Sequence, residues 1–234
     1  MKKVPKFIGL IPARKGSKGL LNKNTLQLLD KPLVQYTIEA AMDSSSMDDV
    51  WVSSDDSEVL SIAESVKANQ LIRPKEFALD KSSALEVVNH FLSTISLDDE
   101  NVNDYIVYLQ PTSPMRNCYH IDDAINHLLL NKVNSLVSVI MLRKSPFKSF
   151  LIDENGRLQS LFDEELSNTR RQDLQDVYIP NGAIYIFQIK EFIKRNCFPS
   201  NGSIPFIMKE EDSIDIDEKE DLIKAEEILR TKNV

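Results

Sequence analysis

The sequence predicts an α/β fold, in which a mostly parallel sheet carries helices on both faces. Short apolar runs of strand length alternate with segments of helical apolar spacing. The first run, FIGLIPA at residues 7–13, is apolar at successive positions, as in a strand buried on both faces. The length of 234 residues, with 42% hydrophobic and 27% charged residues, favours a single globular domain over 1–234.

Strands and helices alternate up to residue 142. Pro32 suits the start of the first helix, and Ser57 or Asp56 suits the cap of the second. The expected strands are 7–13, 48–54, 104–110 and 135–142, and the expected helices are 32–42, 57–70, 82–95 and 121–131.

The alternation breaks over residues 143–178, which we interpret as an excursion from the main sheet. Within it, ENGR at 154–157 predicts the turn of a short hairpin. Beyond it the pattern resumes with a strand at 181–187, a short helix at 190–196, a strand at 204–209 and a final amphipathic helix.

The charge and the cysteines limit the class of protein. A net charge of −8 without a basic stripe disfavours nucleic-acid and anionic-membrane binding. No apolar run approaches the length of a membrane span, and Arg14 and Lys15 end the first run too early for a signal peptide. Cys118 and Cys197 form neither a CxxC pair nor a disulfide framework, so we expect a cytoplasmic protein.

The loop after the first strand concentrates positive charge. It reads Arg14-Lys15-Gly16-Ser17-Lys18-Gly19, followed by Lys23 and Asn24. Its glycines let the backbone approach an anion, and its cations suit a phosphate group. The spacing is neither a Walker A nor a dinucleotide-binding motif. A solvated basic turn has the same composition, so both interpretations stay open.

Asp215 and Asp217 alternate with isoleucines in SIDID, which puts both carboxylates on one face of an extended segment. Such a pair suits Mg²⁺, which takes one or two carboxylates together with substrate phosphates and waters. A structural role is equally open, because Asp217 and Glu220 have the spacing of a helix capping box. The three histidines have no metal-ligand spacing.

Six motifs occur in one order along nearly the whole chain: IPARKGSKGLLNKN, RPKEFALDKSS, LQPTSPMR, RRQD, PNGAIYIF and DSIDID. In these motifs the chain resembles the N-acylneuraminate cytidylyltransferases. The resemblance implies a fold of the nucleotide-diphospho-sugar transferase type and a homodimer. It also implies a reaction that joins CTP to a nine-carbon sugar acid, with Mg²⁺, to give the CMP-sugar and pyrophosphate.

The resemblance assigns roles by position. The nucleotide-binding candidates are Arg14, Ser17, Lys18, Lys23, Asn24, Arg73, Ser82 and Ser83. The sugar-acid candidates are Gln110, Lys148, Arg170, Arg171, Asn181 and Tyr185. Asp215 and Asp217 match the metal carboxylates, and Arg14, Lys18, Lys23 and Arg171 join them as the catalytic set. The excursion at 143–178 matches the dimerisation region, which reaches toward the partner's active site.

The sequence departs from the family pattern at Lys15, which adds a charge to the loop, and at Ala84, which removes a hydroxyl. Two alternatives remain. The substrate can be another ulosonic acid (pseudaminic, legionaminic or eight-carbon), since pocket shape decides that choice. A non-catalytic nucleotide-sugar-binding subunit is the other, although both the charged loop and the aspartate pair are present.

Overall fold

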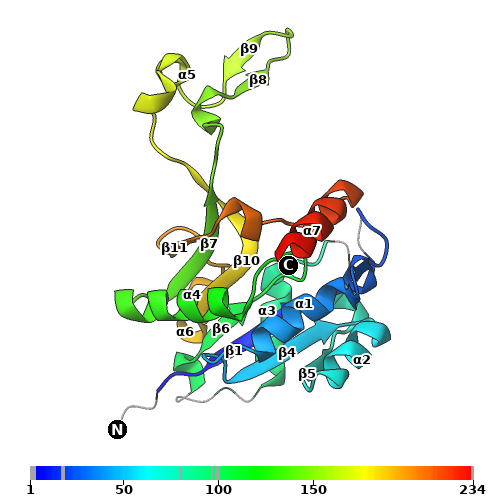
Figure 1. Cartoon of the computed structure of the whole chain (residues 1–234). Helices are drawn as coiled ribbons and strands as arrows, with labels where there is room; N and C mark the ends of the chain where they lie inside the picture. The colour runs from blue at the N-terminus through cyan, green and yellow to red at the C-terminus, as the bar shows by residue number, and fades with distance from the viewer. Residues whose placement is uncertain (1–3, 17–18, 80, 96, 98–100, 233–234) are drawn as a thin grey trace.

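A computed structural model describes residues 4–16, 19–79, 81–95, 97 and 101–232. In this part of the chain a central sheet has the strand order β11-β7-β10-β6-β1-β4-β5 (Figure 1). Its strands are β1 (Phe7–Pro12), β4 (Asp49–Ser54), β5 (Asn69–Ile72), β6 (Tyr105–Tyr108), β7 (Ser135–Met141), β10 (Tyr178–Gln188) and β11 (Ile204–Ile207). Only β10 runs antiparallel to its neighbours among these described strands, so the sheet is mostly parallel, as predicted.

Helices cover both faces of the sheet (Figure 1). The described helices are α1 (Leu33–Met42), α2 (Ser57–Ser65), α3 (Ala84–Thr94), α4 (Cys118–Asn131), α5 (Glu164–Asn168), α6 (Ile189–Arg195) and α7 (Lys219–Lys232). Successive residues of β1 point to opposite faces: Ile11 belongs to a core cluster with α1, α2 and α4, whereas Leu10 belongs to a cluster with α3 and α6. A third cluster joins α7 to the segment around Ile216.

The predicted α/β class is confirmed, but some boundaries were wrong. The helix expected over 57–70 ends at Ser65, because Lys67 takes a left-handed conformation (φ 63°) and β5 follows. Helix α4 begins at Cys118, earlier than expected, because Asn117 and His120 form a capping box. Short strands β2 (Gln27–Leu28) and β3 (Lys31–Pro32) were not predicted.

The excursion projects away from the body of the molecule (Figure 1). It contains α5 and a hairpin of β8 (Phe150–Ile152) and β9 (Leu158–Ser160), whose turn holds Gly156 at φ 74°. The predicted hairpin is therefore confirmed. The excursion closes one residue earlier than expected, since Leu142 donates to the Val177 carbonyl and Tyr178 already belongs to β10.

Among the described residues, no helix combines the length and the apolar character needed to cross a membrane. Cys118 and Cys197 are both free thiols.

Candidate active site

A cleft of about 400 Å³ opens beyond the carboxyl ends of β1 and β6. Parallel sheets place ligands at this edge, because loops from neighbouring strands converge there. The lining includes these predicted residues: Arg14, Lys23, Asn24, Arg73, Ser82, Ser83, Gln110, Asp215 and Asp217. Ser17 and Lys18 lie outside the described residues. The cleft therefore brings the predicted phosphate loop together with the aspartate pair.

The loop after β1 is held by hydrogen bonds at both ends. The Asn24 side chain donates to the Arg14 carbonyl at 2.9 Å, and the Lys15 amide donates to Asp55 at 2.7 Å. Gly19 packs directly on the acidic segment, where a Cβ at this position would lie 2.4 Å from the Asp217 carbonyl. Only glycine allows that approach, so the loop and the aspartates form one structural unit.

Lys23 joins these two parts. Its buried ammonium donates to the Ile216 carbonyl at 2.8 Å and to the Asp217 carboxylate at 2.7 Å. An ammonium in this position offsets the negative charge of one carboxylate in the cleft lining. Lys23 thus connects the basic loop to the aspartate segment and is also a candidate phosphate ligand.

Arg73 also lines the cleft, just after the end of β5. Its guanidinium is buried and donates to the Ser53 carbonyl at 2.7 Å and to the Ser53 hydroxyl at 3.1 Å. Burial lowers the pKa of Arg73, although Tyr108 and Asp55 act in the opposite direction. The site thus holds a fixed, partly desolvated cation, a suitable partner for a polar or anionic ligand.

The beginning of α3 also faces the cleft. Ser83 caps this helix through a capping box, in which its hydroxyl accepts from the Glu86 amide and its own amide donates to the Glu86 carboxylate. The Ser83 hydroxyl is thereby committed to the helix. The N-terminal end of α3 faces the cleft, and the dipole of a helix favours a negatively charged ligand at this end.

Asp215 and Asp217 flank Ile216, which is fully buried, so the predicted alternation is confirmed. The Ile216 amide donates to the Thr112 carbonyl at 2.8 Å, which fixes the segment against the loop after β6. Burial raises the pKa of Asp215, and the Asp217 charge adds to this, although Thr112 and Lys23 act in the opposite direction. Two neighbouring carboxylates thus share one cleft wall.

The predicted capping box of Asp217 with Glu220 was wrong. Helix α7 begins at Lys219, and it is Asp221 that accepts from the Asp217 and Glu218 amides, at 3.2 and 3.0 Å. The Asp217 carboxylate binds Lys23 and keeps 70% of its side chain exposed. Its oxygens therefore remain accessible from the cleft.

The donor set fits a hard divalent cation, because two carboxylates face a cleft that also accommodates substrate oxygens. No group of three or more acidic, histidine or cysteine side chains with metal-site geometry occurs among the described residues. Magnesium commonly takes only one or two protein carboxylates, with phosphates and waters completing its shell, so this smaller set fits that ion.

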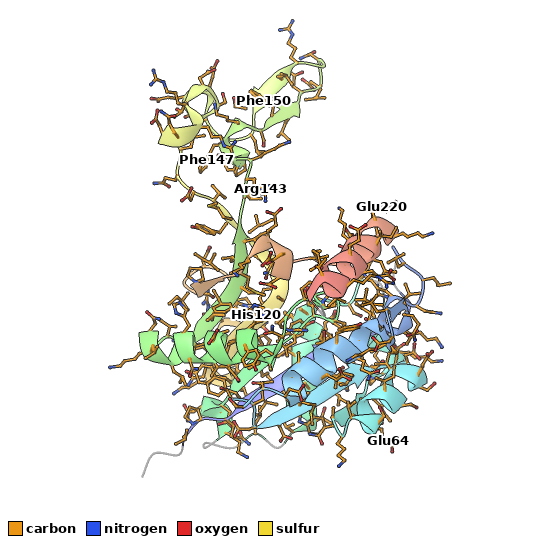
Figure 2. All side chains as sticks on the ribbon, viewed as in Figure 1. Glu64, His120, Arg143, Phe147, Phe150 and Glu220 are labelled. Carbon is orange, nitrogen blue, oxygen red and sulfur yellow. The ribbon has the colours of Figure 1, made fainter. Side chains whose placement is uncertain are left out.

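The remaining sugar-acid candidates do not line this cleft. Lys148, Arg170 and Arg171 lie on the excursion, whose stalk rises from the body near Arg143 (Figure 2). There the Lys148 ammonium donates to the Ser167 carbonyl at 3.2 Å, and Arg171 donates to the Arg143 carbonyl. A single chain therefore does not bring these cations to its own aspartate pair.

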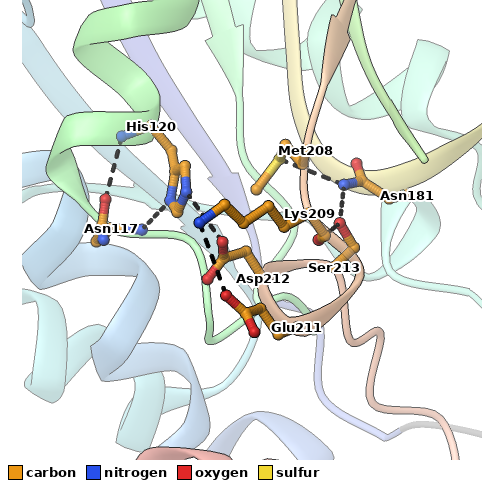
Figure 3. Close-up of polar contacts among 8 residues, drawn as sticks. All are labelled: Asn117, His120, Asn181, Met208, Lys209, Glu211, Asp212 and Ser213. Carbon is orange, nitrogen blue, oxygen red and sulfur yellow. Dashed lines mark hydrogen bonds and ion pairs between the residues drawn. The ribbon is translucent and has the colours of Figure 1, made fainter. Parts of the chain in front are cut away.

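Asn181 and Tyr185 lie within the body, on β10. Tyr185 stacks edgewise on Tyr108 and Phe198, and burial followed by the Asp215 charge raises its pKa. Asn181 is buried, with its side chain hydrogen-bonded to Ser138 and Ser213 (Figure 3). Tyr185 is thus a neighbour of the cleft wall, whereas Asn181 is an interior residue.

Sequence reasoning missed Tyr108 and Thr112, which also line the cleft. Tyr108 ends β6 and is buried, and burial raises its pKa. Both flank Gln110 just beyond the carboxyl end of a predicted strand, and this position alone could have indicated that they line a ligand site. Arg116, in the same loop, is fully buried and donates to the Thr37 hydroxyl at 2.6 Å; burial lowers its pKa to about 9.

A mostly parallel sheet with helices on both faces, and a cleft that joins a basic loop to two carboxylates, place this chain among α/β proteins with a ligand cleft at the carboxyl edge of the sheet. The chain belongs to the cytidylyltransferase family, whose pattern it matches over residues 8–230.

Two curated relatives give the range of similarity. The chain is 41% identical over 229 residues to an N-acylneuraminate cytidylyltransferase of Escherichia coli O18:K1:H7, covering 97% of this chain and 53% of that protein. It is 34% identical to a CMP-N,N′-diacetyllegionaminic acid synthase of Legionella pneumophila, covering 96% of each. The chain thus spans about half the length of the N-acylneuraminate relatives.

Solved structures agree with the fold. CMP:2-keto-3-deoxy-manno-octonic acid synthetase complexed with CTP superposes with a TM-score of 0.69 at 15% identity, covering 97% of this chain and 99% of that one. A 4-diphosphocytidyl-2C-methyl-D-erythritol synthase of Anaerococcus prevotii gives a TM-score of 0.67 at 14% identity, covering 96% and 99%.

Proposed function

We propose that this chain transfers the CMP group of CTP to a nonulosonic acid, with an N-acylneuraminate as the first candidate, and releases pyrophosphate. The observation that carries the proposal is the cleft itself, whose lining gathers the cations Arg14, Lys23 and Arg73 with the carboxylates Asp215 and Asp217. Family membership and the name of the relative that is 41% identical support it.

In the proposed reaction the anomeric hydroxyl of the sugar acid attacks the α-phosphorus of CTP, and pyrophosphate leaves. Such transfers depend on positioning and charge neutralisation more than on covalent help from the protein. Arg14 and the basic loop would hold the triphosphate, while Arg73 and the start of α3 would hold the rest of the nucleotide. Lys23 keeps Asp217 oriented toward the cleft.

Asp215 and Asp217 would hold the divalent cation, which we propose to be Mg²⁺. When bound, such an ion neutralises charge that develops on phosphate oxygens. The protein's own contribution is to hold two carboxylates at a fixed spacing beside the cleft. Lys23 and Thr112 favour the ionised form of Asp215, against the effect of its burial.

The acceptor acid would be bound in part by a second copy of the chain. Lys148, Arg170 and Arg171 are cations suited to a carboxylate, but they lie on the excursion, away from the cleft of their own chain (Figure 1). The excursion also exposes a group of large apolar side chains, namely Phe150, Leu151, Ile152, Leu158, Leu161 and Phe162. Isolated soluble chains rarely expose such a patch, which supports a homodimer formed through residues 143–178.

Other nonulosonic acids form the second candidate substrate class. The Legionella pneumophila relative is named for a legionaminic acid, and a relative from Campylobacter jejuni that is 29% identical is named for pseudaminic acid. The match to the Legionella pneumophila relative covers nearly the full length of both chains, which favours testing legionaminic acid beside N-acylneuraminate.

The free thiols and the proposed use of CTP support a cytoplasmic location.

Pyrophosphate release tests this proposal. With Mg²⁺, CTP and a panel of nine- and eight-carbon ulosonic acids, we expect turnover with at least one acid and far less with ATP. Absence of turnover with every acid, in protein that binds CTP, would instead favour a non-catalytic nucleotide-sugar-binding subunit.

A further inference from the structure

We propose that residues 53–55, at the carboxyl end of β4, are positioning residues that fix the basic loop and Arg73 in place for CTP. They are Ser53, Ser54 and Asp55. The proposal rests on the proposed function, because it concerns the cations that would bind the nucleotide. None of the three residues lines the cleft, so they act on the nucleotide through Arg14 and Arg73, which do line it.

Strand β4 lies between the two strands whose ends carry these cations. It pairs with β1, where Pro12 is opposite Ser53, and with β5, where Leu71 is opposite the same serine. All three strands run parallel, so their carboxyl ends meet at the edge of the sheet where the cleft opens. The end of β4 therefore reaches both the loop after β1 and the residue that follows β5.

The backbone on both sides of Arg14 is fixed by this end of β4. On one side the Ser54 hydroxyl donates to the Ala13 carbonyl. The same hydroxyl accepts from the backbone amide two positions further on at 2.9 Å, which fixes its orientation. On the other side the Lys15 amide donates to the Asp55 carboxylate at 2.7 Å. The loop therefore cannot shift at Arg14 unless one of these hydrogen bonds breaks.

Arg73 is held by the same strand end through its backbone and its side chain. Its amide donates to the Ser54 carbonyl at 2.8 Å, and its guanidinium donates to both the carbonyl and the hydroxyl of Ser53. These bonds use the Nε and one Nη2 hydrogen of the guanidinium. Because Arg73 lines the cleft, the other N–H groups of its fork can serve a ligand there.

The two serines are unusual residues for the centre of a sheet. Strands favour β-branched and aromatic residues, whereas Ser53 and Ser54 are fully buried. A buried hydroxyl costs free energy unless it is hydrogen-bonded. The Ser53 hydroxyl accepts from Arg73, and the Ser54 hydroxyl joins Ala13 to the start of α2. Both hydroxyls thus bind segments that converge on the cleft edge, which explains polar residues at these positions.

The cations need such a scaffold because they carry like charge. Burial is the main cause that lowers the pKa of Arg73, while Asp55 raises this pKa and Arg14 lowers it. Both charges thus lie within electrostatic reach of the Arg73 guanidinium. Without a ligand, like charges favour separation of the two side chains, whereas a polyphosphate draws them together. Fixing them before the nucleotide arrives reduces the cost of ordering them on binding.

The test pairs Asp55→Ala with Asp49→Ala. Asp49 lies at the opposite end of β4, where its carboxylate accepts from the Asn69 side chain of β5 at 2.9 Å, so it is a matched control. Asp55→Asn keeps an acceptor oxygen and serves as the rescue variant. Ser53→Ala removes one hydroxyl and keeps the backbone carbonyl. The Kd for CTP is measured by calorimetric titration, and a thermal melt of each variant reports its stability.

We expect Ser53→Ala and Asp55→Ala each to raise the Kd for CTP by about three- to tenfold, as the loss of one hydrogen bond implies. Asp55→Asn should bind CTP more tightly than Asp55→Ala does. Asp49→Ala should keep the wild-type Kd, even where its melting temperature falls. Lower melting temperatures in all variants with an unchanged Kd for CTP would mean a structural role only and would overturn the proposal.

A double substitution separates positioning from direct contact. In an Arg73→Ala background, Ser53→Ala should change the Kd for CTP by less than about twofold, because the group that Ser53 positions is gone. An equal effect of Ser53→Ala in both backgrounds would overturn its assignment. A wild-type protein that binds no CTP would instead refute the proposed function.

Discussion

At the scale of single residues, the neighbours Arg14 and Lys15 distinguish a phosphate site from a solvated basic turn. Arg14 lines the cleft, whereas the Lys15 side chain is exposed and does not. We expect Arg14→Ala to weaken CTP binding by about ten- to a hundredfold, because a charge-assisted contact is lost, and Lys15→Ala to change it little. Calorimetric titration with CTP measures both. Equal, small losses would favour the solvated turn.

A substitution of Asp215 distinguishes a role in metal binding from a role in stability. The pKa of its carboxyl is raised in the fold, so the folded protein holds the proton more tightly than the unfolded chain does. Its contribution to stability is therefore favourable at acidic pH and is lost as the pH rises through the folded-state pKa. At neutral pH and without metal, Asp215→Asn should melt at the wild-type temperature or slightly above it.

In turnover the same Asp215→Asn variant should lose activity by orders of magnitude and need more Mg²⁺. Asp122→Asn is the control, because Asp122 accepts hydrogen bonds from the turn after α1 and does not line the cleft. It should lower the melting temperature and keep most of the turnover. Wild-type turnover of Asp215→Asn at limiting Mg²⁺ would leave the pair without a metal role.

At the scale of elements, Asp122 ties α4 to the turn after α1. Its carboxylate accepts from the Ser44 hydroxyl at 2.6 Å, the Ser45 hydroxyl at 2.9 Å and the Ser46 amide at 3.0 Å. Burial pushes its pKa up, but these hydrogen bonds outweigh burial and lower the pKa. A lowered carboxyl pKa stabilises the fold above the unfolded-state pKa, and that stabilisation is lost as the pH falls through the folded-state pKa.

Thermal melts of Asp122→Asn should therefore show a loss of about 2–4 °C near neutral pH, equivalent to about 1 kcal/mol, since partial exposure keeps the effect at the low end. The difference from the wild type should shrink as the pH falls below the ordinary range of aspartate toward the lowered folded-state pKa of Asp122, where the wild-type carboxyl takes up its proton. A difference that is constant between pH 3 and pH 7 would contradict this assignment of the pKa.

The elements also show where sequence reasoning succeeds and fails. The apolar runs and helical spacings predicted the main strands and helices, because burial of one face is a local property of the pattern. The start of β5 depends on the left-handed Lys67, and the bulge in β10, where the register against β7 shifts between Pro180 and Tyr185, depends on that partner strand. Neither is encoded in local periodicity.

The candidate site, like the fold, could be predicted only in part from the sequence. Charge and carboxylate spacing indicated Arg14, Lys23, Asp215 and Asp217, which the cleft brings together. The partners of Asn181 come from β7 and from the segment before α7, so only the tertiary fold shows that its amide is already occupied.

At the scale of the whole molecule, the excursion should complete the active site of a second copy. We predict a dimer by light scattering and complementation between two inactive variants, Arg171→Ala and Asp215→Asn, when they are co-expressed. In a mixed dimer, the intact cleft of the Arg171→Ala chain receives the intact excursion of the other chain. About a quarter of the sites are then whole, for random pairing of two subunits.

Activity restored to roughly that fraction would support a shared site, whereas the separately purified variants, mixed without exchange, serve as the control. No restoration in a proven mixed dimer would mean that Arg171 acts in its own chain, and an active Arg171→Ala variant would mean that Arg171 has no role. A fully active monomer would contradict the dimer proposal itself.

The central claim is that CMP passes from CTP to a sugar acid in this cleft. The most direct measurement is ³¹P NMR of the reaction with CTP, Mg²⁺ and the most active nonulosonic acid. We predict equal amounts of one new phosphodiester signal, from the CMP-sugar, and of pyrophosphate, with neither formed by Asp215→Asn. Unchanged CTP, or its conversion to free CMP or to CDP and phosphate without a CMP-sugar signal, would contradict the claim.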